Sequence, residues 1–488
     1  MSRLILNLVV ALGLTTTAAC VRTDCANNDL SCGSGPLLWA ISDCPATTSW
    51  HTFLGGALNN STTFQSQGDG AGGYIVAGFA ADDFISNPRR AFEGAAGTLN
   101  NFLVRVSPDG GIVWGTYLGT AAANGMALFV GEEGATLISD VNAAFGNPIN
   151  PFQGGTDILI ARVSLDGDLL WHTFQGSATA DRGVGISRRT DGGFWITGAL
   201  QNTAGGAAGV NLLTHPNPGV DAGFAQILDA NGNAISHSFY GSATQTRFIG
   251  QAITAQNELY ALGTAAGALS GAYPNTIVNH TGGGGNDGLL VKLNSAGGYL
   301  YHTFQGESTT NQRFGGGAVQ SDGSIIVANS TGASYGTPLA PFTGGSLDFA
   351  ISRYNADGSL QWLTFVGGAG ADDIGSVGVS RNGGAWIGGS SDATFGEPIA
   401  PYVHNGGGAN HSAVFGVGPN GTVGAPLFFG TAAATAGASG ILETCEGGLL
   451  VTNRINGAYG ARPLVPFAGG PLAGLLIRLD VALQLGTL

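Results

Sequence analysis

Apolar and polar residues alternate over short stretches along most of this chain, and residues typical of turns separate the stretches. In residues 162–176, two alternating segments flank the pair Asp166-Gly167. Alternation with a period of two predicts β-strands, and an Asp-Gly pair between strands predicts a tight hairpin whose loop has positive φ angles. The pattern therefore indicates that the chain is built from β-hairpins.

The second half of this hairpin recurs as the pattern Trp-x-Thr-Phe-x-Gly. Its seven copies begin at positions 50, 114, 171, 236, 301, 362 and 425, so the period is roughly 60 residues. A fixed period of this kind indicates a repeat architecture. Each period holds a second hairpin, so we expect four strands, named A to D: residues 183–187, 194–198, 157–163 and 169–174.

Four antiparallel strands per repeat are typical of one blade of a β-propeller. Seven B strands predict seven blades, and the fold class is all-β, because no segment after the N-terminus has a helical period. A C-like strand, Leu475–Leu479, lacks a D strand after it. We therefore expect Trp50–Phe53 to supply the outermost strand of the last blade, which closes the ring and hides its edges.

The composition fits this fold and excludes one class of partner. Glycine makes up 85 of 488 residues, which we explain by about four turns in each of seven blades. The formal net charge is −14 and Lys292 is the single lysine. Such an acidic chain repels a phosphate backbone, so nucleic acid is not expected as a partner.

The first residues have the features of an export sequence. Arg3 precedes the apolar run Leu4–Leu14, and small residues lead to Cys20. This pattern predicts a signal peptide at 1–19. The small residues before Cys20 resemble the lipoprotein box of bacteria, which implies that Cys20 is acylated; ordinary cleavage beside an unmodified cysteine is the alternative.

The resulting boundaries are a signal peptide at 1–19, a linker to the lipid anchor at 20–36 and the propeller at 37–488. Val21 follows the anchor in place of the Asp that resembles an inner-membrane retention signal. We therefore expect an exported lipoprotein of the outer membrane or cell surface, which contacts the membrane only through its N-terminal anchor.

Four further cysteines allow three disulfide connectivities in an exported chain. Cys44 lies just before the first repeat, beside a predicted strand at Leu37–Ile41, and Cys445 lies in the A–B turn of the last blade. If the N-terminal strands join the last blade, these two cysteines meet. We therefore favour Cys44–Cys445 and Cys25–Cys32.

The B–C and D–A connections are longer than the A–B and C–D turns, and we expect them on the opposite face of the ring. Long loops on a rigid scaffold often bind ligands. Four B–C loops share a motif that begins and ends with an aromatic residue. These candidate binding residues are Phe145, Phe152, Tyr335, Phe342, Phe395, Tyr402, Tyr459 and Phe467. The alternative is that a motif repeated in four blades fixes each loop to its own blade.

Other polar residues do not form a catalytic motif. Ser107–Trp114 fits the Asp-box, a structural turn of sialidases, but the strand C arginines are spread round the ring. The histidines at positions 51, 172, 237 and 302 lie on different blades, so they cannot share a metal. Asp157, Asp287 and Asp348 precede strand C after glycine-rich turns; they could bind Ca²⁺, or more simply shape the turn. No catalytic residue and no cofactor are expected.

The set formed by Gly-Gly-Thr-Asp157-Ile-Leu-Ile-Ala-Arg162, Trp171-His-Thr-Phe-Gln-Gly176 and Gly192-Gly-Phe-Trp-Ile-Thr-Gly198 resembles the SBBP repeat of bacterial surface proteins and lipoproteins. It is similar, more distantly, to the NHL repeat. The resemblance covers about residues 50–480. It implies a propeller and an exported location, and it brings no catalytic residues with it.

These features favour a non-catalytic binding or scaffold protein that recognises a protein or a glycan through its long-loop face. The alternative is a carbohydrate-active enzyme, glycosidase-like or lyase-like, with a site at the central channel. Acidic residues that converge there with Arg or Tyr would favour the enzyme, whereas a glycine-lined channel would favour binding. The sequence leaves the ligand and the oligomeric state open.

Overall fold

The computed structural model describes residues 49–479 except 57–61, 96, 203–208, 215–218, 242, 270–272, 283–284, 308–311, 400–402, 405–409, 432–434, 445–447, 460–462, 465–466 and 469–471. The described residues form 28 strands and no helix. In consequence, this part of the chain contains no helix that could cross a membrane.

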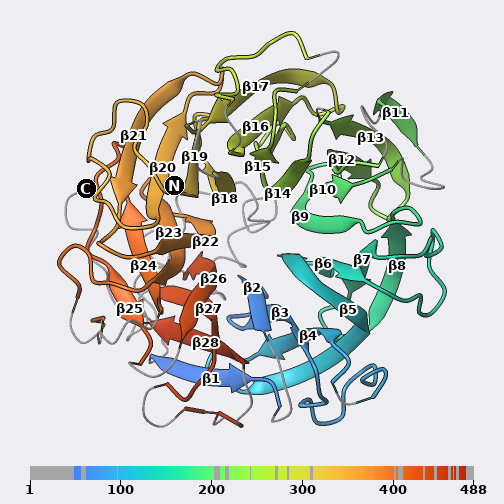
Figure 1. Cartoon of the computed structure of the whole chain (residues 1–488). Coiled ribbons are helices and arrows are strands. Elements are labelled where there is room, and N and C mark those ends of the chain that lie inside the picture. The colour runs from blue at the N-terminus through green and yellow to red at the C-terminus, as the bar shows by residue number, and fades with distance from the viewer. Residues whose placement is uncertain are drawn as a thin grey trace, which may run out of the picture.

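The strands form seven blades of four antiparallel strands around a central axis, and β5 joins the first two blades into one sheet (Figure 1). In each blade, strand position A is innermost and position D is outermost. The strands of the first three blades are β2 (Thr62–Gly68), β3 (Tyr74–Ala80), β4 (Asn100–Val106) and the first half of β5 (Ile112–Gly131); the second half of β5, β6 (Gly134–Val141), β7 (Asp157–Val163) and β8 (Leu169–Gln175); and β9 (Arg182–Arg188), β10 (Phe194–Leu200), β12 (Ala222–Leu228) and β13 (Ala234–Tyr240).

The remaining four blades repeat this order. Their strands are β14 (Thr246–Ile253), β15 (Leu259–Ala265), β16 (Asp287–Leu293) and β17 (Tyr299–Gln305); β18 (Arg313–Val319), β19 (Ile325–Thr331), β20 (Asp348–Tyr354) and β21 (Leu360–Val366); β22 (Asp372–Val379), β23 (Ala385–Ser391), β24 (His411–Val417) and β25 (Leu427–Phe429); and β26 (Ala436–Glu443), β27 (Leu449–Ile455), β28 (Ala473–Leu479) and β1 (Trp50–Leu54). The seven-bladed propeller predicted from the sequence is confirmed.

The ring closes through the N-terminal strand, as predicted. β1 pairs antiparallel with β28, and Trp50 lies opposite Arg478. Figure 1 shows the blue β1 beside the red β28 at the rim. Leu54, Leu450 and Leu476 are buried in one cluster with residues of the first blade, so the last and first blades share an apolar core. The clusters between the second and third blades and between the third and fourth blades are built in the same way.

The hairpin at Asp166-Gly167 differs from the two-residue loop that the sequence predicted. Gly167 has a φ of 92°, and Asp166 is not among the residues with positive φ. The Gly167 N–H donates to the Ser164 carbonyl, and the Ser164 hydroxyl accepts from the N–H groups of Asp166 and Asp168. One left-handed glycine and a serine side chain therefore shape a longer turn, in the manner of a type I turn with a bulge.

Outer edges are covered by the B–C connections, which run back along strand D. The Ile149 N–H donates to the His172 carbonyl in the second blade, and the Leu339 N–H donates to the Leu363 carbonyl in the fifth. In the third blade this segment forms an additional strand, β11 (Val210–Leu213), parallel to β13. Covering the edge in this way removes a template for aggregation.

Candidate functional site: the central channel

The wall of the central channel consists of the seven A strands. In six blades, the pairing of strands A and B shifts by one residue, and this leaves one A-strand residue without a partner in strand B. These six residues are Phe64, Val184, Ile249, Gly315, Gly375 and Ser439. In the second blade an irregularity falls between Ala121 and Met126. Bulges of this kind bend a strand and are common beside binding sites.

Glycines in these strands let neighbouring blades approach closely. A Cβ on Gly375 would lie 2.0 Å from the Ala438 carbonyl oxygen of the next blade, and one on Gly440 would lie 2.7 Å from the Phe64 carbonyl oxygen. Any larger residue would separate these strands. The glycine content therefore has a second cause besides the turns, namely backbone contact between blades around the axis.

The channel holds a cavity of about 380 Å³ at the end where the A–B turns lie, and every A strand contributes to its lining. Tyr74 is the one aromatic residue among the described lining residues. Four polar atoms of lining residues are buried without a hydrogen-bond partner in the protein: Ser66 Oγ, Gln251 Oε1, Ser376 Oγ and Thr444 Oγ1. These atoms have almost no accessible surface, so they lie between strands and are not available to a molecule in the channel.

Charged lining residues belong to the A–B turns or to the strand end beside them. Asp69 accepts hydrogen bonds from the N–H groups of two turn residues. It also forms an ion pair with Arg105, whose Nε lies 2.6 Å from Asp69 Oδ2. Glu443 accepts from the Trp386 indole at 2.9 Å and from the Ser380 hydroxyl. These two carboxylates are thus used to hold the turns.

The strand C cations are spread round the ring, as the sequence indicated. Each of four pairs with an acid in the A–B turn of its own blade or just beside it: Arg105 with Asp69, Arg162 with Glu133, Lys292 with Glu258 and Arg353 with Asp322. They form separate ion pairs around the mouth and not a single anion site.

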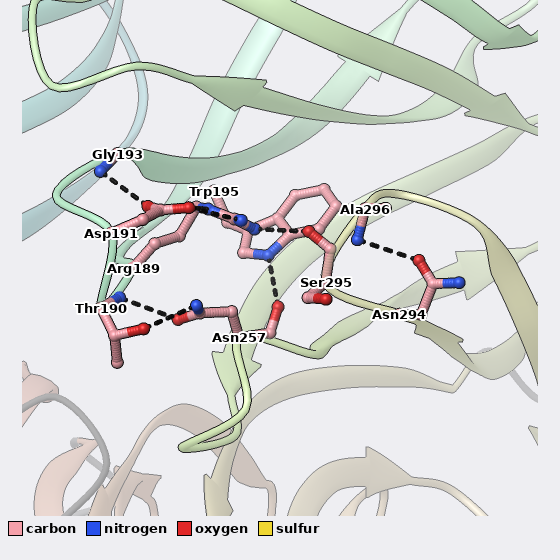
Figure 2. A network of polar contacts seen from close by, with 9 residues as sticks. All are labelled: Arg189, Thr190, Asp191, Gly193, Trp195, Asn257, Asn294, Ser295 and Ala296. Carbon is pink, nitrogen blue, oxygen red and sulfur yellow. Dashed lines mark hydrogen bonds and ion pairs between the residues drawn. The ribbon is translucent and has the colours of Figure 1, made fainter.

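Aromatic residues of strand B connect three blades to the next on the face that carries the A–B and C–D turns. The Trp195 indole N–H donates to the Asn257 carbonyl of the next A–B turn at 2.9 Å, while Arg189 donates to the Ser295 carbonyl of the next C–D turn at 2.8 Å (Figure 2). Trp386 and Tyr260 make the corresponding bonds elsewhere. This network makes the mouth of the channel a fixed surface.

The first residue of the Trp-x-Thr-Phe-x-Gly pattern likewise connects its blade to the next one, at the rim. The Trp114 N–H donates to the Leu165 carbonyl at 2.8 Å, and its ring covers Gly167. Equivalent bonds are Trp50 to Pro108, Tyr301 to Ala356 and Trp362 to Pro419. At Ser236 the aromatic ring is missing, and Leu212 of β11 lies at the glycine of the next turn, Gly297. The sequence displayed the pattern but not these partners.

The aromatic residues proposed as binding residues pack against strand D of their own blade. Phe145 stacks on His172 with centroids 4.4 Å apart, and Phe152 meets Phe174 edge-on. The other contacts are Tyr335 and Phe342 with Phe365, Phe395 with Phe428, Tyr459 with His51 and Phe467 with Phe53. These contacts account for the motif without a ligand. Tyr402 lies outside the described residues.

The three aspartates considered for Ca²⁺ accept hydrogen bonds from their own loops. Asp157 accepts from the Gln153 N–H at 2.6 Å, Asp287 from Thr281 at 2.7 Å and Asp348 from Thr343 at 2.7 Å. No group of three or more His, Cys, Asp or Glu side chains in the described part of the chain is placed to hold a metal. The observed bonds fit the turn-shaping alternative.

Histidines of strand D are likewise held within single blades. His172 contacts the Phe145 carbonyl through Nε2 at 2.8 Å, and His302 contacts the Tyr299 hydroxyl through Nδ1 at 2.7 Å. Burial lowers the pKa of His172 and lowers that of His302 to about 4. They are neutral packing groups on separate blades.

The cysteine predictions concern Cys20, Cys25, Cys32, Cys44 and Cys445, which all lie outside the described residues. The predicted strand at Leu37–Ile41 also lies outside them. The lipid anchor and both disulfide pairings therefore stay predictions.

Comparison with known proteins gives no family for this chain. No protein-family model matches it, and no curated protein matches it. Solved structures do match. They include a protein of unknown function from Dyadobacter fermentans, 9% identical, with a TM-score of 0.41 over 89% of this chain and 99% of that one. A neuraminidase-like protein from A/bat/Guatemala/164/2009 is 10% identical, with a TM-score of 0.35 over 90% and 94% of the two chains. A quinohemoprotein alcohol dehydrogenase from Comamonas testosteroni is 10% identical, with a TM-score of 0.38 over 89% and 76%.

Proposed function

We propose that this protein is a non-catalytic binding or scaffold module of the cell envelope, exported and anchored through an acylated Cys20. The observation that carries the binding role is the central cavity of about 380 Å³, whose wall is rich in glycine and whose carboxylates Asp69 and Glu443 hold turns. This wall can enclose a ligand, and because the ion pair of Asp69 with Arg105 belongs to a turn at the mouth, we assign it no catalytic role.

We infer that the binding site lies at the channel mouth and not on the long loops expected from the sequence. The long B–C loops run back along the rim, and their described aromatic residues are packed against strand D. Strand A is the innermost strand of each blade, so its inner backbone groups line the channel. In the second blade, those of Leu128 and Val130 already bond the side chains of Gln65 and Gln67. Backbone groups at a strand edge favour an extended protein segment over a glycan as the ligand.

Gly68 offers a direct test of this site. It borders the cavity, and a Cβ added to it meets no atom within 4 Å. Gly68→Trp should therefore fill the mouth without straining the fold. We would compare it with Ala178→Trp, an exposed position in a D–A connection, by pull-down from envelope extracts and by glycan array, with and without Ca²⁺.

Loss of a partner with Gly68→Trp alone supports binding in the channel. Equal binding by both variants and the unchanged protein would place the interaction elsewhere and overturn the channel site. A specific glycan on the array, followed by its hydrolysis or elimination, would contradict the non-catalytic role. Mass spectrometry of the protein purified from membranes tests acylation of Cys20 separately.

A further inference from the structure

Exposed aliphatic side chains recur at two repeat positions on the outer rim. The first position lies one or two residues before the first residue of the Trp-x-Thr-Phe-x-Gly pattern, at the start of strand D. The second position is in the B–C connection. Its residue lies over the C–D turn of the next blade or at the matching repeat position. The members are Val113, Leu170, Ile235, Leu360 and Val423 at the first position, and Ile149, Leu212, Ile277, Leu339 and Leu464 at the second. We call these ten residues the rim belt.

These positions account for most of the large apolar residues that the described part of the chain exposes. Val113 is 56% exposed, Leu170 53% and Leu339 61%. Single exposed apolar residues are ordinary on protein surfaces. A set that recurs at equivalent places in successive blades, all at the end of strand D that carries the C–D turn, is different, because it surrounds one face of the disc.

At the C–D turns, a residue of the first rim-belt position and a residue of the second lie close together. Ile149 lies within about 3 Å of the Cβ position of Gly232, in the turn that leads to Ile235. Leu464 lies in the same way at Gly110, before Val113, and Leu339 lies at Gly421, before Val423. In the first blade Arg89 takes the second position, with its aliphatic stem against Gly167. Each of these junctions therefore presents aliphatic groups at the edge of the same face.

The chain enters the described fold at this same face. Trp50 begins β1 opposite Arg478, near the end of β28, and donates to the Pro108 carbonyl of a C–D turn. The 48 residues that precede the described part, including Cys20, therefore connect to the propeller on the side that the rim belt surrounds. The acids of four A–B turns on this face are paired with strand C cations, whereas the C–D turns carry exposed aspartates such as Asp109 and Asp166, so the face is acidic.

We propose that the rim belt rests on a lipid surface, with the A–B and C–D face of the propeller turned toward the membrane. The orientation rests in part on the proposed anchor at Cys20, but the aliphatic belt is a separate observation. Aliphatic side chains that enter the boundary of headgroups and acyl chains bind a membrane in proportion to the apolar area they bury. Because the chain carries a net charge of −14, contact depends on these apolar groups and not on anionic lipid.

The test uses residues 21–488, which lack the acyl chain but keep every strand of the ring, and phosphatidylcholine vesicles in a flotation assay. The unchanged protein should float with the vesicles, and 0.5 M NaCl should not release it. The triple variant Val113→Asp, Leu170→Asp and Ile235→Asp should lower the ratio of bound to free protein by about tenfold or more. Its matched control adds the same three charges in D–A connections, through Ala178→Asp, Ala243→Asp and Ala369→Asp, and should bind as the unchanged protein does.

A gain of binding guards against loss through misfolding. Leu170→Trp should raise the bound fraction several-fold, since Trp favours the membrane interface. The proposal is overturned if the unchanged protein does not float, if both triple variants lose binding equally, or if light scattering shows a dimer that only the rim variant disrupts. Absence of acylation at Cys20 would remove the anchor but would leave the flotation result intact, so the two proposals fail separately.

Discussion

Asp157 and Asp181 face one another across Gly176. A Cβ on Gly176 would lie 2.6 Å from Asp157 Oδ1 and 2.9 Å from Asp181 Oδ2, and both aspartates are fully buried. Gly176 is the last residue of a Trp-x-Thr-Phe-x-Gly repeat, so this approach explains why the pattern ends in glycine. Asp348 and Asp372 face one another across Gly367 in the same way, whereas at Gly306 the pair is Asp287 and Gln312.

The pH dependence of stability should reflect these pairs. Burial, reinforced by the charge of Asp157, raises the pKa of Asp181 to about 7. Because this value lies above that of an unfolded Asp, its contribution to stability is complete below about pH 4 and is lost as the pH rises through 7. Between pH 6.5 and 8 we expect the free energy of unfolding to fall by at most about 1.4 kcal/mol per pH unit from this group.

Asp181→Asn should flatten that slope, because an amide replaces the neutral acid, as Gln312 does beside Asp287. The measurement is the difference between the urea midpoints of the two proteins at pH 6.5, 7.25 and 8. Buried histidines such as His302, with a pKa of about 4, contribute an opposite slope up to the pKa of an unfolded histidine, and this slope cancels in the difference. Asp168→Asn, at an exposed turn, is the control. An unchanged slope in Asp181→Asn would show that this carboxyl is not the titrating group.

Gly176→Ala should lower the free energy of unfolding by about 1–3 kcal/mol, because its Cβ would press on two buried carboxyl groups. Gly68→Ala is the matched comparison, since its Cβ would meet no atom within 4 Å. It should stay within about 0.5 kcal/mol of the unchanged protein. Chemical denaturation of both variants at one pH checks the difference, and equal losses would contradict the steric explanation.

Hydrogen bonds between blades should have a measurable share in stability. Trp114→Phe keeps the ring over Gly167 but removes the bond to the Leu165 carbonyl, so we expect a loss of about 1–2 kcal/mol. Trp171 covers Gly232 in the same way, and its indole has no hydrogen bond among the described residues. Trp171→Phe should therefore cost less, and the difference between the two urea midpoints isolates the hydrogen bond.

β1, which closes the ring, should contribute as much to the free energy of unfolding as the equivalent part of β5. Leu54 of β1 and Leu118 of β5 occupy the same place in their repeats and are both fully buried. Leu54→Ala and Leu118→Ala should each cost about 2–5 kcal/mol. If β1 were a loosely attached strand, Leu54→Ala would cost much less than Leu118→Ala in the same thermal or urea unfolding experiment.

Features that depend on near neighbours in the chain could be predicted from the sequence. Alternation around Asp166-Gly167 predicted strands, the spacing of the pattern gave seven blades, and the missing D strand after Leu479 identified β1 as its replacement. The bond from Trp114 to Leu165 could not be predicted in this way, because it joins residues 51 positions apart through a turn of another blade. Periodicity describes one strand face and contains no information on the next sheet.

The candidate site was less predictable than the fold. The channel wall consists of A strands with bulges at residues such as Val184, Ile249 and Gly375. The bulge residues share no residue type, so no sequence pattern identifies them. The conspicuous aromatic residues of the B–C loops, in contrast, attracted attention as binding residues, although Phe145 and Phe395 are buried against their own blades. A repeated aromatic motif in this chain indicates packing, because every copy meets the same strand D.

Closure by β1 also determines the order in which the molecule can be completed. Trp50 is made early, yet its partner Arg478 follows about 430 residues later. At 5–20 residues per second, roughly 20 to 90 seconds of synthesis separate the two strands. During that time the first strand has no sheet to join, so the ring cannot close until β28 has been made, and a fragment that ends before β28 keeps both ends of the ring open.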